Sequence, residues 1–260
     1  MDATAATATP KVRLNRFLPY WAVLQADFSA TLNSWLYRVW VLLSIAVAVG
    51  YLLYRYGAMR VSGMIQPAPE AVGDLLAWVI YGSITLIIAL TAGTICSERG
   101  SMADSILSRG ISRYQYFLGK LHARLGLVLI TFFAKGSLVL GAAYYMLHSD
   151  ALTLHGCAVA LLVVASLLVF VGTFGVSVSA MSSNTLVSIA VVWITLYGTG
   201  FVLSQLPGTF PSPERAIQGL PSVLKGWYDW NLLSKLMLTS LAASGMTALI
   251  GMYHFSGRDV

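Results

Sequence analysis

The chain has 260 residues, of which 57% are hydrophobic and only 10% are charged, and its formal net charge at pH 7 is +6. This composition excludes an ordinary soluble domain, which carries more charge and fewer continuous apolar segments. A porin-like barrel is disfavoured as well, because the apolar runs are continuous and lack the alternation of spanning strands. The basic residues flank these runs and form no dense patch with interleaved aromatic residues, so we expect no nucleic-acid partner.

The first patterned segment covers residues 16–35. Its apolar residues recur at steps of three and four, while Gln25, Ser29 and Asn33 lie toward another face. This spacing predicts an amphipathic helix that lies at the membrane interface. Such a helix either only anchors the chain or acts as an elbow that leads into the first span.

Six apolar runs then follow, against about 20 residues needed for one helical crossing of a bilayer. Lipid does not satisfy exposed backbone groups, so the crossings must be helical. We therefore predict an all-α integral membrane protein that forms one transmembrane domain over residues 1–260. The predicted spans are residues 39–54, 75–96, 125–147, 157–181, 186–206 and 236–255.

The orientation follows from the distribution of Lys and Arg, which favour the cytoplasmic side of a membrane. With a cytoplasmic N-terminus, ten of these residues fall on the inner side and five on the outer side. The first apolar run begins only near residue 39, so no cleaved signal peptide is expected. We predict a multi-pass protein of the cytoplasmic (inner) membrane with both termini in the cytoplasm.

Two loops and two cysteines complete the outline. Residues 97–124 form the predicted cytoplasmic loop, and the proline-rich residues 207–235 form an outside loop with short re-entrant helices. Cys96 and Cys157 are expected at opposite membrane faces. The histidines and methionines of the outer loops show no repeated ligand spacing, so we predict no metal site.

The cytoplasmic loop is the most informative polar segment. Met102, Ile106 and Leu107 form the apolar side of a short predicted helix, which charged residues accompany. A soluble partner could bind such a helix. The alternative is a solvated amphipathic loop that lies on the inner leaflet.

The order of residues in this loop resembles the permease subunits of the type-two ABC exporter family. The match consists of Glu98, Gly100, Ile106, Leu107, Ser108, Ser112, Arg113, Gly119 and Lys120, and the ending from Phe255 to Asp259 also resembles that family. The expected topology agrees over nearly the whole chain, with an interfacial helix, six spans, a coupling helix and short re-entrant helices.

The resemblance implies a permease that works as a dimer, with a second copy of itself or a homologous permease, and that binds a separate ATP-binding cassette ATPase. The coupling helix would cover residues 101–109. ATP and Mg would be held by the partner, because no P-loop motif occurs in this chain, which is therefore not itself an enzyme. The docking residues implied by the loop are Glu98, Gly100, Asp104, Ile106, Leu107, Arg109 and Arg113. The substrate stays open, and a periplasmic accessory protein is compatible with this arrangement.

Lys135 is the remaining candidate, since it stands alone near the middle of the third predicted span. A cation at this depth costs about 2.5 to 3.5 kcal/mol, so it should face protein, water or a ligand. It either lines a translocation path and attracts an anionic head group, or donates to backbone carbonyls between helices. The rival interpretation of the whole chain is a membrane scaffold or assembly factor that transports nothing.

Overall fold

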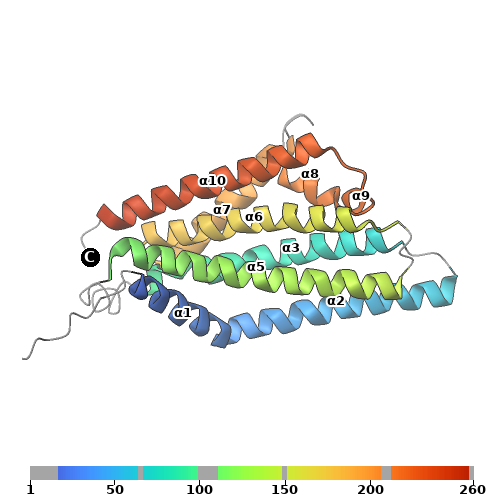
Figure 1. The fold of residues 1–260 in the computed structure, drawn as a ribbon, viewed down its shortest axis with the longest axis horizontal. Helices are drawn as coiled ribbons and strands as arrows, with labels where there is room; N and C mark the ends of the chain where they lie inside the picture. Colours follow the sequence, from blue (N-terminus) through green and yellow to red (C-terminus); the bar gives the residue numbers. More distant parts are fainter. Residues whose placement is uncertain (1–16, 64–66, 99–110, 148–150, 206–211, 258–260) are drawn as a thin grey trace, which may run out of the picture.

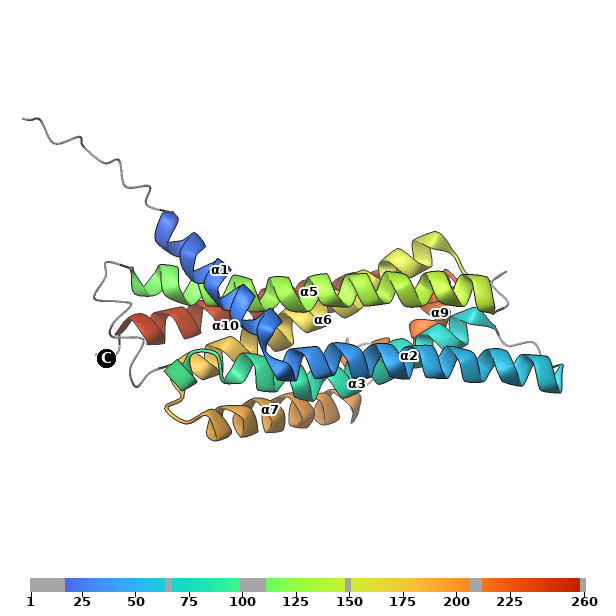
Figure 2. The same cartoon turned by 90° about the horizontal axis from the view of Figure 1, so that it is seen from below.

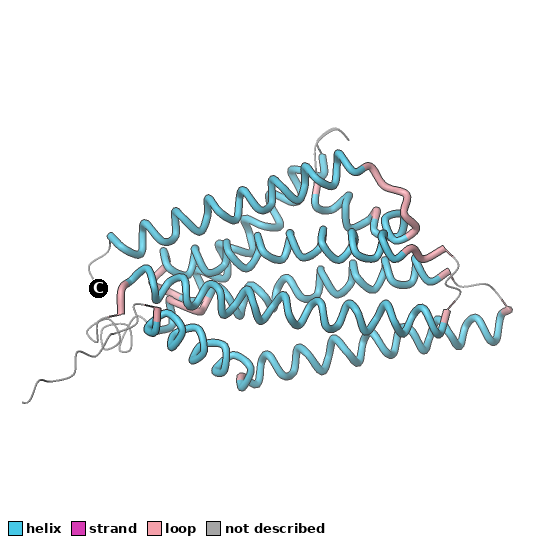
Figure 3. Tube along the Cα trace, viewed as in Figure 1, coloured by secondary structure: helices cyan, strands magenta, loops and turns pink. Residues whose placement is uncertain are grey.

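A computed structural model of the chain describes residues 17–63, 67–98, 111–147, 151–205 and 212–257. These residues are nearly all helical, and none of them forms a β-strand (Figure 3). The elements in chain order are α1 (Leu18–Asn33), α2 (Trp35–Ser62), α3 (Ala68–Ala92), the 3-10 turn η1 (Cys96–Glu98), α5 (Arg113–Met146), α6 (Leu154–Met181), α7 (Thr185–Gln205), α8 (Pro213–Gln218), α9 (Leu220–Leu224) and α10 (Trp230–Gly257).

Six of these helices are long and apolar enough to cross a membrane, namely α2, α3 with η1, α5, α6, α7 and α10. The predicted all-helical architecture with six candidate spans is therefore confirmed, and it is the pattern of a multi-pass membrane protein. The helices extend beyond the apolar runs. With 34 residues, α5 measures about 51 Å at roughly 1.5 Å per residue, well over the hydrocarbon thickness of about 30 Å.

The helices run back and forth between two ends of an elongated bundle (Figure 1). We call them the α1 end and the α9 end. At the α1 end lie α1, η1, the start of α5 and the end of α10, whereas α8 and α9 lie at the opposite end. Cys96 is buried in η1 and Cys157 is half-buried in the first turn of α6, so the two free thiols occupy opposite ends as expected.

The core is organised around α6, which packs against α3, α5, α7, α9 and α10. Small residues allow this close packing. A Cβ atom on Gly175 of α6 would lie 2.1 Å from the Oγ1 atom of Thr91 in α3, so only glycine fits there. Small residues at helix crossings let membrane helices approach closely. By contrast, α2 and α7 lie at the margins of the bundle (Figures 1 and 2). Both helices expose most of their apolar side chains.

The short helices α8 and α9 precede α10 and cover the bundle at the α9 end. The backbone N–H of Thr153 donates to the carbonyl of Leu224 at 3.1 Å, which joins α9 to the start of α6. Pro221 also lies so close to Gly73 of α3 that a Cβ there would approach its ring to 2.5 Å. Two short helices were expected in this loop and two occur. Their insertion into the outer leaflet stays a prediction.

The helix expected over residues 16–35 is present as α1, and it lies obliquely across α5 (Figure 2). Val23, Asp27 and Thr31, spaced by four residues, form its buried face. The apolar stripe that suggested an interfacial helix points elsewhere, because Phe17 and Trp21 are 70% and 61% exposed. A polar side chain therefore contacts the bundle while large apolar side chains stay outside.

Candidate functional site

The most strongly polar site of the described structure is a buried group of five side chains at the α1 end. We call it the ionic cluster, and its members are Asp27 of α1, Glu98 of η1, and Tyr116, Lys120 and Arg124 of α5. The Nζ atom of Lys120 lies 3.1 Å from Asp27 Oδ1 and 2.6 Å from Glu98 Oε1. The Nε atom of Arg124 lies 2.8 Å from Asp27 Oδ2, and the Tyr116 hydroxyl donates to Glu98 Oε2.

Regular helical spacing brings this cluster together. Tyr116, Lys120 and Arg124 follow one another at intervals of four, so they line one face of α5. Asp27 is the middle member of the buried face of α1. The two helices approach closely at Gly119, where a Cβ atom would lie 2.9 Å from the Cγ1 atom of Val23.

The cluster balances two carboxylates against two cations, and the central pair of Asp27 and Lys120 is shielded from solvent. The side chains of Asp27 and Lys120 are each 5% exposed, whereas those of Arg124 and Glu98 are 14% and 30% exposed. Removing charges from water is expensive, and a buried pair is held only where the geometry is good and further hydrogen bonds are made. Loss of one partner would leave an uncompensated charge, so the cluster ties α1, η1 and α5 into one unit.

An apolar layer encloses the cluster and extends it to α10. The Tyr116 ring stacks on Phe255 with centroids 6.0 Å apart, and Arg113 donates from its guanidinium to the carbonyl of Ser256 at 3.2 Å. The turn before η1 is held from another side, because the hydroxyl of Ser179 in α6 accepts from the N–H groups of Ile95 and Cys96. The long helices α5, α6 and α10 therefore meet at this end, together with α1 and η1.

Of the predicted docking residues, the structure describes two. Glu98 belongs to the ionic cluster, and Arg113 binds the end of α10. The expected coupling helix at residues 101–109 lies outside the described residues, as do Gly100, Asp104, Ile106, Leu107 and Arg109.

Sequence reasoning did not find the partners of Glu98. Asp27 is the only acidic residue of α1, and it was not singled out because the apolar stripe of that helix dominated the interpretation. Lys120 was named only as part of the family match, and Arg124 was counted only as an inner-side charge. The four-residue spacing of Tyr116, Lys120 and Arg124 was the available signal, yet spacing within one helix does not reveal which distant residue it faces.

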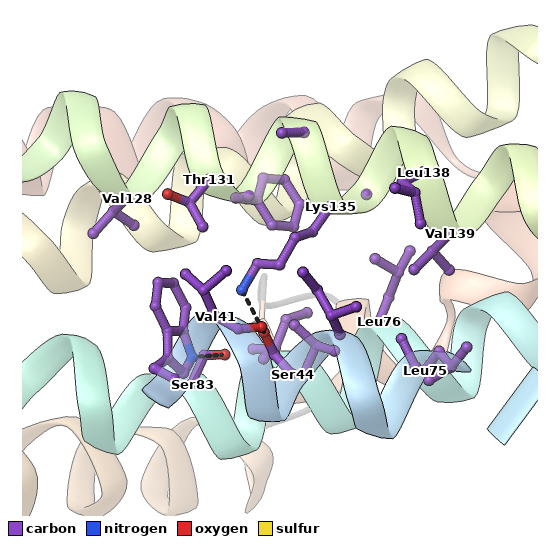
Figure 4. A pocket seen from close by; sticks show the side chains of 18 of the residues that line it. Val41, Ser44, Leu75, Leu76, Ser83, Val128, Thr131, Lys135, Leu138 and Val139 are labelled. Carbon is purple, nitrogen blue, oxygen red and sulfur yellow. Dashed lines mark hydrogen bonds between the residues drawn. The ribbon is translucent and has the colours of Figure 1, made fainter. Parts of the chain in front are cut away.

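The second candidate site is an apolar cavity of about 360 Å³ that contains Lys135 (Figure 4). Its walls come from α2, α3 and α5, with Leu168 added by α6. Among the described residues of this wall, Lys135 is the only charged one. The polar atoms near it belong to a small set: Tyr37, Trp40, Ser44, Ser83 and Thr131.

Lys135 extends from α5 across the cavity toward α2. Its Nζ atom donates to Ser44 Oγ at 2.8 Å (Figure 4). The same atom lies 3.7 Å from the centre of the Trp40 ring. The indole N–H of Trp40 in turn donates to Ser83 Oγ at 3.1 Å, which fixes the ring. Lys135 thus contacts a hydroxyl and an aromatic face, and no bond from it to a backbone carbonyl occurs in the described structure.

Helix α3 is longer than the apolar run that predicted it. The helix begins at Ala68 rather than at residue 75, so it includes Glu70 and Asp74. Both are paired near the α9 end. Asp74 lies 2.8 Å from Arg55 of α2, and Glu70 lies 3.2 Å from Lys225.

These features define a class, an all-helical multi-pass membrane protein with a charged, buried junction at one end of the bundle. No model of a known protein family matches the chain, and no curated protein matches it.

Proposed function

We propose that the chain is the membrane-spanning permease subunit of an ATP-binding cassette exporter. In this proposal a separate ATPase hydrolyses ATP, and the permease moves a substrate across the cytoplasmic membrane. The observation that carries the proposal is the ionic cluster, because it joins the two flanks of residues 99–110 to the helices of the bundle.

The two flanks of this segment are anchored differently. On one side, Glu98 binds Tyr116 and Lys120. On the other side, the Ser112 hydroxyl caps α5 by accepting from the N–H of Gln115, while the Gln115 side chain accepts from the N–H of Ser112. A force applied to residues 99–110 by a bound partner would act on η1 and on the start of α5. From there it would reach α1 through Asp27.

The family resemblance supplies the nature of that partner. The ATPase would bind through the coupling helix predicted at residues 101–109 and would hold ATP and Mg, since the motif for phosphate binding does not occur in this chain. ATP-driven closure of two such partners would alternate the access of a path between the halves of a dimer. The second half would be another copy of this chain or a homologous permease.

Exposed apolar helices support both the membrane and the dimer. Leu186 and Phe201 of α7 are 77% and 68% exposed, and α2 exposes Leu42 to 69%. Such surfaces require lipid or another protein. At the α1 end, Trp35 is 74% exposed where α1 meets α2, which favours an interfacial position for α1. With the positive-inside bias, this end would face the cytoplasm.

The test is to co-express the chain with candidate ATPases, purify it in a mild detergent and measure bound protein and ATP hydrolysis. We expect one ATPase to co-purify, and we expect the double substitution Ile106→Glu and Leu107→Glu to release it. Gln218→Glu, an exposed change in α8 at the opposite end, serves as the control and should retain the ATPase. If the wild-type chain retains no nucleotide hydrolase, the non-transporting scaffold becomes the better interpretation.

A further inference from the structure

The cavity around Lys135 opens at the side of the bundle rather than at either end. The residues at its mouth are exposed and apolar, with Ile45 and Val49 on α2 and Ile130 and Leu138 on α5. These two helices form the margin of the bundle on that side (Figure 2). A molecule that enters here therefore comes from the apolar surroundings of the helices.

Lys135 gives this apolar cavity one point of positive charge. An ammonium group has three N–H donors, of which Ser44 accepts one while the Trp40 ring faces another. Ser44 cannot supply a negative charge, and its own hydroxyl donates to the carbonyl of Val41 at 2.9 Å. The ammonium is held in position, but its charge is not neutralised by any described side chain.

The carboxylate closest in sequence to the cavity wall does not fill this role. Asp74 precedes the lining residue Leu75, but it binds Arg55 at 2.8 Å and the Tyr51 hydroxyl at 3.0 Å. The cavity volume of about 360 Å³ falls within the range of small-molecule sites, and such sites are mostly apolar with few polar groups that fix orientation.

We propose that this cavity binds a single-chain anionic amphiphile, with its carboxylate or phosphate on Lys135 and its hydrocarbon chain along the apolar wall between α2 and α5. Charge complementarity selects the head, because the cavity offers one cation near Ser44 and Trp40. The size of the cavity and the side of its opening select a single chain over a bulky polar solute.

That the bound amphiphile is transported rests on the proposed function. That it binds depends on the cavity alone. The experiment therefore uses the full-length chain purified in a non-ionic detergent, without any ATPase. Radiolabelled palmitate and its methyl ester are the probes, and equilibrium binding is measured for each. We expect the acid to bind at least tenfold more tightly than the ester, because only the acid carries the charge that Lys135 attracts.

Four variants separate the contact with the charged head group from non-specific hydrophobic binding. Lys135→Met should weaken palmitate binding about tenfold and leave the ester unchanged, while Lys135→Arg should stay within about threefold of wild type. Lys235→Met removes an exposed lysine of α10 and is the matched control, with no change expected. Val49→Trp at the mouth should weaken the acid and the ester alike. Each variant should elute from size-exclusion chromatography as one symmetric peak, which shows that it is folded.

A second arm identifies the source of the anion. Lysophosphatidylglycerol replaces palmitate in the same binding measurement. If Lys135→Met abolishes the binding of lysophosphatidylglycerol, this would support a lipid phosphate as the head group. Lys135-dependent binding of palmitate alone would support a free fatty acid. Equal affinity of the wild-type chain for palmitate and its methyl ester, or palmitate binding that Lys135→Met leaves intact, would overturn the proposal. Either result would leave the ATPase test unaffected.

Discussion

The ammonium group of Lys120 lies 3.1 Å from the carboxylate of Asp27 although 93 positions separate the two residues, and each side chain is 5% exposed. This contact joins α1, which lies obliquely outside the bundle, to α5, which runs its full length (Figure 1). A buried ion pair holds its partners in one relative position, since each charge is costly without the other. Stability should therefore depend on the pair much more than on the exposed pairs of the chain.

The first prediction concerns Asp27. Asp27→Asn should lower the free energy of unfolding by roughly 3–5 kcal/mol, because Arg124 would lose its only described carboxylate. The matched control is Glu70→Gln, which breaks the more exposed pair with Lys225 and should cost less than about 1 kcal/mol. Unfolding by a denaturing detergent in mixed micelles measures both. Equal losses in the two variants would contradict the structural role of the cluster.

The second prediction concerns the tyrosine that binds Glu98. Tyr116→Phe keeps the ring against Phe255 and removes only the hydroxyl. The free energy of unfolding should therefore fall by about 1.5–3 kcal/mol, as for the loss of a hydrogen bond to a charged group. Tyr114 on the same helix is 51% exposed, and Tyr114→Phe should change the stability by less than about 0.5 kcal/mol. The same mixed-micelle unfolding curves measure the difference. If Tyr116→Phe leaves the stability unchanged, Glu98 is held in place without the Tyr116 hydroxyl.

The third prediction concerns the crossing of α3 and α6. Gly175→Ala should destabilise the bundle by about 1–3 kcal/mol, because the added methyl group meets Thr91 where no space exists. Gly198 of α7 has no atom within 4 Å of the position of an added Cβ, so Gly198→Ala should be neutral or stabilising by up to about 1 kcal/mol. Thermal unfolding of the detergent-purified variants compares the two. If Gly175→Ala is as stable as the wild-type chain, α3 and α6 must lie farther apart at their crossing than the structure shows.

The fourth prediction concerns orientation. In a background with Cys96→Ala and Cys157→Ala, Ser105→Cys should resist a membrane-impermeant maleimide in intact cells and react after lysis. Lys225→Cys, at the α9 end, should react before lysis. The reason is the excess of Lys and Arg on the side predicted to be cytoplasmic. Labelling of Ser105→Cys in intact cells would reverse the topology and would remove the docking loop from the reach of an intracellular ATPase.

Local patterns in the sequence were enough to predict the architecture of the protein. The six spans, the helix at residues 16–35 and the short helices before α10 were all predicted from apolar length, spacing and proline positions, which are properties of neighbouring residues. The helix ends were less well predicted, since helices continue past the hydrocarbon. For this reason α3 begins at Ala68 and includes Glu70 and Asp74.

Composition and spacing established that this chain crosses a membrane as helices, because hydrophobic length and backbone satisfaction act locally along the sequence. They also marked Lys135 as unusual. Its contacts with Ser44 and Trp40, and the meeting of Asp27, Glu98 and Lys120, emerged only from the packed bundle. Each of these contacts depends on how separate helices are rotated and shifted against one another, and the pattern of a single helix does not contain that information.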